Sequence, residues 1–394
     1  MNIRMNTKTS VFLGIASLAA LAACSKVEPF IPDTPITFTV ASYMPQTRAG
    51  ESLFLTESGG KFYSRAYLHA KGFEEDEQLF FGAYETINYN NGTSEWAPSH
   101  EYYWPKHAES YINFFSWFDN AASVTPPTIA ETSTGATLSW GSRTIGKDDN
   151  LMFADAAWHY NKNPKSTENN ANPGPANTYG NDGVTEGVPT LFHHALAKLS
   201  IKVKMEDPNI ATTDKTTWEI SLSNIKLSSV HKEGKLDLST TAKSSTGTSS
   251  WVVSGTTNAP VVWVSTDTAS DITMDAPTSS ISTEATTILS DYSVLPQAIT
   301  EDMKLSFDCQ IFTYYDKTNN ATPYSKEKFN VSVKIADFTS FTDGANHPVE
   351  TPDAWKMNTK ITYNISINPK TSQVKFDPAV EDWAVLNGGS YIVQ

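Results

Sequence analysis

Residues 199–205 read Leu-Ser-Ile-Lys-Val-Lys-Met, with an apolar side chain at every second position. A period of two is typical of a β-strand that has one face on a core and the other in water. The same alternation returns at residues 36–40, 218–222, 225–227, 329–335 and 361–367. Many such strands, separated by Gly, Pro, Asn and Ser clusters, predict an all-β chain of antiparallel sandwiches with little helix.

Composition limits the classes of partner. The 394 residues carry a formal net charge of −14, which disfavours nucleic acid and anionic lipid. The 10 Trp, 16 Tyr and 19 Phe can fill sizeable cores.

A long polar stretch at 161–183 is too poor in apolar residues to pack. We expect it to mark the boundary between a first domain at 24–188 and a second domain at 189–394.

The start of the chain carries an export signal. Residues 11–24, VFLGIASLAALAAC, form a short apolar run behind basic residues, which is the layout of a secretory signal. The run is too short to span a bilayer of about 30 Å. Its end resembles a bacterial lipobox, which implies that residues 1–23 are removed by a cut after Ala23 and that the Cys24 thiol is acylated. The alternative is an ordinary signal peptide with a chance cysteine.

The sequence offers no persuasive catalytic, cofactor or metal site. Cys309 lies on the apolar side of an alternating run and is expected to be a buried small side chain rather than a nucleophile. His193 and His194 are adjacent on a predicted strand, so they face opposite ways and do not share a metal. We therefore expect a protein that is not an enzyme.

The aromatic-rich stretch at 96–118 allows two interpretations. We expect its rings to fill a core, because Trp and Phe supply much of the buried area of a sandwich. The alternative is a sugar-stacking platform that includes Trp96 and Trp104, in a monomeric surface lipoprotein that binds glycans or a host receptor. A β-sandwich glycoside hydrolase is disfavoured, because no pair of carboxylates can be nominated.

Several short motifs along nearly the whole chain together resemble one family. They are Thr47-Arg48-Ala49, Tyr102-Tyr103-Trp104-Pro105-Lys106, Leu151-Met152-Phe153-Ala154, Phe192 to Leu199, Leu295-Pro296-Gln297, Trp355 to Ile365 and Phe376 to Trp383. Their order and spacing resemble the fimbrillin family of Bacteroidetes lipoproteins, which are subunits of type V pili. The resemblance implies two transthyretin-like sandwich domains and a cell-surface location on the outer membrane.

The resemblance also implies a mechanism of assembly. A first strand at 34–48, with Ile36, Phe38 and Val40 on its apolar face, would be removed by an arginine-specific protease that cuts between Arg48 and Ala49. A strand from the C-terminal end of another subunit would then fill the open groove by β-strand addition.

The candidate donor strand is Tyr391, Ile392 and Val393, although these residues also fit the last strand of the second domain. The implied partners are other pilus subunits in a homo- or hetero-polymer, the protease, the outer membrane through the lipid, and a host or bacterial surface receptor. The resemblance does not decide whether this subunit forms the shaft, the tip, an accessory part or the anchor of a pilus.

Overall fold

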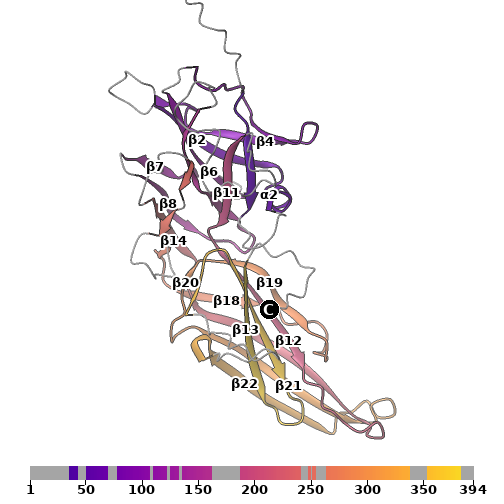
Figure 1. Ribbon diagram of the computed structural model, residues 1–394. Helices are drawn as coiled ribbons and strands as arrows, with labels where there is room; N and C mark the ends of the chain where they lie inside the picture. Colours follow the sequence, from indigo (N-terminus) through magenta and orange to yellow (C-terminus); the bar gives the residue numbers. More distant parts are fainter. Residues whose placement is uncertain are drawn as a thin grey trace, which may run out of the picture.

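The computed structural model describes residues 35–42, 50–69, 78–106, 110–121, 125–132, 135–161, 187–240, 247–249, 251–253, 263–337 and 353–382. Nearly all regular structure in these ranges is β-strand, so the all-β prediction is confirmed. The molecule is elongated, with β2, β4, β6 and β11 at the upper end and β12, β13, β21 and β22 at the lower end (Figure 1). No helix in the described ranges is long and apolar enough to cross a membrane.

The strands of the first half close into a ring. Its order is β6, β9, β11, β1, β5, β4 and β2, and β2 pairs with β6 to close the circle. β3 continues from β2, and β10 followed by β15 continues from β6. The bounds are β1 (Phe38–Ser42), β2 (Lys61–His69), β3 (Gln78–Leu79), β4 (Glu85–Asn90), β5 (Glu95–Pro98), β6 (Tyr111–Asp119), β9 (Leu151–Ala154), β10 (Ala156–Tyr160), β11 (Val188–His194) and β15 (Gly247–Ser249).

β6 is the central strand of this half, because it is buried on both faces. Ile112, Phe114 and Phe118 point into the ring, whereas Phe115 and Trp117 join a second core on its outer side. The prediction that the aromatic residues of 96–118 fill a core is confirmed for the Trp and Phe residues, whereas Tyr103 is 41% exposed.

A second sheet covers the outer side of the ring. It runs β16-β14-β8-β7, with β17 also paired to β14. The bounds are β7 (Thr128–Glu131), β8 (Ala136–Thr144), β14 (Glu233–Ser239), β16 (Val252–Val253) and β17 (Trp263–Ser265). The pairings β8–β14 and β10–β15 join strands from both sides of residue 188. The division into domains at 24–188 and 189–394 stays a prediction.

The second half is built of two sheets that share one apolar core. Their orders are β19-β12-β24-β25 and β18-β13-β21-β22. The bounds are β12 (Ala197–Met205), β13 (Thr216–Val230), β18 (Ser270–Met274), β19 (Thr286–Val294), β21 (Lys304–Tyr315), β22 (Ser325–Lys334), β24 (Thr359–Ile367) and β25 (Val374–Asp382), beside the small pair β20 (Gln297–Ala298) and β23 (Ala354–Trp355) and the 3₁₀ helix η2 (Ile335–Asp337). Cys309 is fully buried in β21, as expected from its place in the alternating run.

Two pairings differ from the expected antiparallel pattern. β1 runs parallel to β11, and β12 runs parallel to β24. Each pair joins segments far apart in the chain, and a long connection permits the crossover that parallel pairing requires.

Candidate functional site

The first strand lies inside the ring rather than at its edge. β1 has β11 on one side and β5 on the other. The apolar face predicted from alternation is buried, with Ile36, Phe38 and Val40 only 1%, 4% and 2% exposed. We call the space that this segment fills between β11 and β5 the first-strand slot.

Main-chain bonds hold the segment on both sides of the slot. The backbone N–H of Ile36 donates to the carbonyl of Tyr102 at 2.9 Å, and the N–H of Val188 donates to the carbonyl of Thr37 at 2.8 Å. Gly187 lies so close to the backbone of β1 that a Cβ at its position would be 2.6 Å from the carbonyl carbon of Phe38. Only glycine allows this approach without a shift of the backbone.

Aromatic rings form the inner wall of the slot. Phe38 packs edge-on against Phe62 and Phe114, with ring centroids 5.5 and 5.6 Å apart. The helix α2 (Gly50–Ser58) sends Phe54 into the same core, where it stacks on Phe192 with centroids 4.1 Å apart. The chain thus returns to the ring directly after the connection at 43–49.

A buried polar contact joins α2 to β11. Nε2 of His194 lies 3.2 Å from Oε2 of Glu57, and Nδ1 lies 2.9 Å from Oδ1 of Asn150. Burial lowers the pKa of His194, an effect that the facing Glu57 carboxylate only partly offsets. The imidazole is therefore held neutral at neutral pH.

The adjacent histidines face different partners, as predicted. Nε2 of His193 lies 3.2 Å from Oδ1 of Asp155, whereas His194 faces Glu57. Among the described residues, no three His, Cys, Asp or Glu side chains are grouped to hold a metal ion.

The sugar-stacking interpretation is wrong for the two tryptophans on which it depends. Trp96 is 1% exposed and Trp104 is 5% exposed, so neither presents a ring face to a ligand. Trp96 packs against Phe62 and Phe54, and Trp104 packs edge-on against Phe114. Both rings belong to the apolar core inside the ring.

The remaining predicted site residues lie outside the described ranges. They are Cys24, Arg48 and Ala49, and the candidate donor residues Tyr391, Ile392 and Val393. Sequence reasoning missed Gly187 and Phe54, which also shape the slot. The signals available were weak: a glycine before the apolar residue Val188, and one aromatic in a nine-residue helix.

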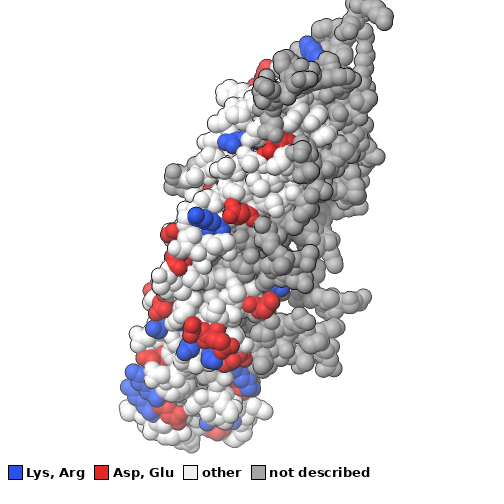
Figure 2. All heavy atoms as spheres, turned by 90° about the vertical axis from the view of Figure 1, so that its left-hand side faces the viewer, with Lys and Arg blue, Asp and Glu red and all other residues white. Residues whose placement is uncertain are grey.

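Charges on the outer surface are mixed. On the face shown in Figure 2, acidic and basic side chains of the described residues lie close together towards the lower end. Pairs such as Lys215–Asp316 and Lys334–Glu301, with N···O distances of 2.6 and 2.7 Å, balance charge locally. Such exposed pairs contribute little to stability.

Comparison with known proteins gives one family. A family model described as fimbrillin-like matches residues 47–383. The crystal structure of a fimbrial protein from Bacteroides vulgatus has a TM-score of 0.51 at 16% identity, covering 89% of this chain and 100% of that one. Candidate cell adhesion proteins from Bacteroides ovatus and Bacteroides uniformis give TM-scores of 0.43 and 0.40, each at 13% identity, covering 91% and 90% of this chain and 100% of theirs. No curated protein sequence matches.

Proposed function

Because this chain belongs to the fimbrillin-like family, we propose that it is a pilus subunit that assembles by exchange of its first strand. Membership supports a structural or adhesive role in fimbriae at the cell surface, together with other pilus subunits. The finer proposal concerns how one subunit joins the next.

The observation that carries this proposal is the central place of β1 in a closed ring. Removal of an edge strand would leave its sheet intact, but removal of β1 would unpair β11 and β5 together. It would also uncover the cavity that Ile36, Phe38 and Val40 fill. Burial of a large apolar side chain is worth about 1.5–3 kcal/mol, so a vacant slot strongly favours another extended strand.

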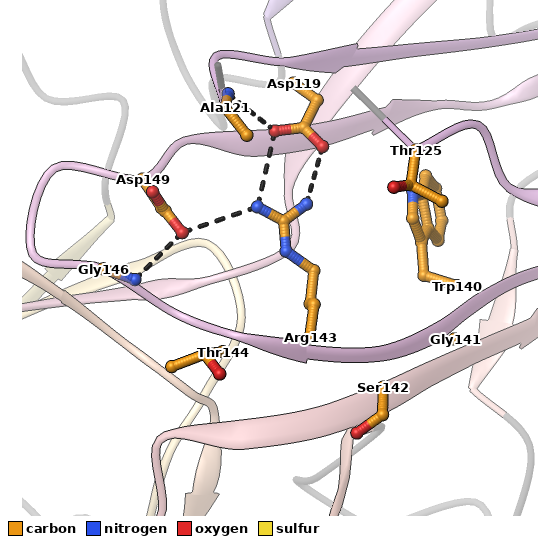
Figure 3. Close-up of a pocket in the computed structure, with 10 residues that line it drawn as sticks. All are labelled: Asp119, Ala121, Thr125, Trp140, Gly141, Ser142, Arg143, Thr144, Gly146 and Asp149. Atoms are coloured by element: carbon orange, nitrogen blue, oxygen red, sulfur yellow. Dashed lines mark hydrogen bonds and ion pairs between the residues drawn. The ribbon is translucent and has the colours of Figure 1, made fainter. Parts of the chain in front are cut away.

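The proposed cut lies between Arg48 and Ala49, in the connection from β1 to α2. The other two arginines of the exported chain, Arg65 and Arg143, are poor alternative cleavage sites for the protease. Arg65 lies within β2 opposite Phe115, and its Nε donates to the carbonyl of Ala83 at 2.6 Å. Arg143 lies within β8 and is paired with Asp119 (Figure 3). A protease needs an extended, accessible segment, which a paired strand does not provide.

Export and donation complete the proposal. Acylated Cys24 would tether the chain to the outer membrane before the cut, and Tyr391 to Val393 would supply the donor strand. We also propose that the chain has no catalytic role and that 24–188 and 189–394 are its two structural units. Strands from 233–265 would then pack back onto the first unit.

Limited digestion with an arginine-specific protease tests the cut. We expect N-terminal sequencing to find a product that begins at Ala49, and Arg48→Ala to abolish it. Arg65→Ala is the matched control and should leave the product unchanged.

Size-exclusion chromatography tests the exchange. Cut wild-type chain should form polymers, and a cut chain that ends at Gly389 should remain monomeric. Monomers from both chains would favour the alternative, a monomeric surface lipoprotein.

A further inference from the structure

The two ends of the first-strand slot differ in exposure. At the entry end, where the chain comes in, Pro35 and Tyr103 face each other in an isolated bridge, and both are exposed. At the exit end, where the chain leaves, Ser42 pairs with Phe192. The Phe192 side chain is 0% exposed, and Phe54 of α2 stacks on its ring. The entry end is therefore the more open of the two.

The walls of the slot fit a strand that runs in the direction of β1. β11 pairs with β1 in parallel along Phe38–Ser42, whereas β5 pairs with it antiparallel. Parallel and antiparallel ladders place their N–H and C=O groups in different patterns. A replacement strand in the same direction can take over the bonds that β1 makes to the carbonyl of Tyr102 and the N–H of Val188. A reversed strand would meet both walls in the wrong pattern.

The C-terminal segment starts beside the exit end of the slot of its own molecule. Thr359, the first residue of β24, pairs with Asp382, the last residue of β25. The neighbouring Asn358 accepts a hydrogen bond from the backbone N–H of His194 at 3.3 Å. His194 ends β11, two positions beyond Phe192 at the exit end. The chain after β25 therefore begins close to the exit end and far from the entry end.

The candidate donor residues leave only a short link to β25. With Tyr391 in the place of Phe38, Gly388 takes the place of Pro35. Residues 383–388 then form the link between β25 and the slot. A fully extended chain covers at most about 3.6 Å per residue, so this link reaches about 22 Å.

The entry end of the same molecule lies beyond that reach. His194 is six residues beyond Val188 along β11. Val188 pairs with Phe38, which is three residues beyond Pro35. About nine residues of extended strand, or about 30 Å, thus separate the level of His194 from the entry end. The C-terminal segment of one molecule is too short to enter its own slot in the direction of β1.

Resting on the proposed strand exchange, we infer that the slot takes the C-terminal segment of a second copy in the direction of β1, with Gly388 of that copy against Tyr103. Removal of β1 would take Pro35 away from Tyr103, and a glycine without a Cβ fits beside the exposed ring. The Tyr103 hydroxyl donates to Oε2 of Glu101 at 2.8 Å, which orients the ring at the entry end. Asp382 of the donor copy then lies within about 22 Å of the entry end of the acceptor.

Disulfide trapping in the cut chain tests this inference. The variant carries Tyr103→Cys and Gly388→Cys on a background of Cys24→Ala, in which the remaining native thiol, Cys309, is fully buried. Residues that face each other in an antiparallel bridge are close enough for a disulfide. Oxidation should join cut chains into a covalent ladder on a non-reducing gel, at least tenfold more than uncut chains. When ¹⁵N-labelled and unlabelled chains are mixed before the cut, mass spectrometry should find linked 103–388 peptides that join heavy to light chains.

Tyr103→Cys with Gln394→Cys is the matched control. A reversed strand with the same central residue, Tyr391, would bring Gln394 instead of Gly388 to the entry end. The control should form at most a tenth as many links. The inference is overturned if the control links more than the Gly388 variant, if the Gly388 variant links within single chains, or if cut chains form polymers with neither link.

Size-exclusion chromatography of the reduced samples separates this failure from a failure of strand exchange. Polymers without the expected link would leave strand exchange standing and overturn only the direction and docking inferred here. Absence of polymers from the cut parent chain would overturn strand exchange, and this inference with it.

Discussion

Replacement of Phe38 by Ala tests whether β1 is an integral part of the ring. The Phe38 side chain is 4% exposed and packs edge-on against Phe62 and Phe114. Truncation of a buried Phe costs about 3–5 kcal/mol, since transfer energy is lost and a cavity remains. Each edge-to-face contact accounts for about 0.5–1.5 kcal/mol of this loss. We expect the free energy of unfolding of the uncut chain to fall by about 3–5 kcal/mol.

The same substitution should change how firmly a severed β1 is held. After a cut in the connection to α2, β1 stays in its slot through non-covalent contacts alone. A loss of about 3–5 kcal/mol corresponds to an affinity about 100- to 4,000-fold weaker, because each 1.4 kcal/mol is a factor of ten. Release of a fluorescently labelled N-terminal segment, followed by anisotropy, measures this difference.

Thr37→Ala is the control for both measurements. Thr37 lies on the same segment but is only half-buried, and its carbonyl keeps the bond from the N–H of Val188. We expect its effect to stay within about 0.5 kcal/mol. If Phe38→Ala unfolds and releases the strand as Thr37→Ala does, the reasoning about the slot is refuted.

Three further predictions concern other parts of the described structure. Gly187→Ala should destabilise the chain by about 1–3 kcal/mol and speed strand release in the anisotropy assay, because its Cβ would collide with the Phe38 backbone 2.6 Å away. Burial raises the pKa of the Cys309 thiol to about 12, so iodoacetamide at pH 8 should modify its peptide only in denaturant, as read by mass spectrometry. Burial lowers the pKa of His194 in the folded state, so the unfolded state binds more protons than the folded state as the pH falls below about 6.5. The free energy of unfolding should therefore fall by up to about 1.4 kcal/mol for each unit by which the pH is lowered. Urea titrations at pH 7 and 5 should show a smaller fall for His194→Asn, whereas a wild-type chain that gains stability at pH 5 would contradict the neutral imidazole.

Alternation of apolar and polar residues predicted those strands that have one buried and one solvent-exposed face. β21 alternates as expected, and Cys309 lies on its buried side. β6 is different, because its burial on both faces removes the period of two and leaves a nearly continuous apolar run. Its composition still indicated a core, but the sequence could not show that the core has two sides.

Long-range pairing could not be predicted from the sequence. The parallel partner of β1 is β11, and no local pattern connects Phe38 with Val188. No local pattern in the sequence predicts that β14 returns to pair with β8 either.

In the proposed exchange, the closed ring would restrict which strand could replace β1. Ile36, Phe38 and Val40 are two residues apart, and a slip of one residue would turn every side chain to the other face of the strand. In the C-terminal segment, Tyr391 and Val393 have this spacing, and the residue two positions before Tyr391 is Gly389. A register with Tyr391 and Val393 inward therefore fills two of the three pockets and leaves the third to glycine. A register with Ile392 inward would send Ser390 and Gln394 into the other two, at the cost of burying polar groups. In the proposed exchange the slot favours the first register, because that register buries two large side chains, Tyr391 and Val393, whereas the second buries Ile392 together with Ser390 and Gln394.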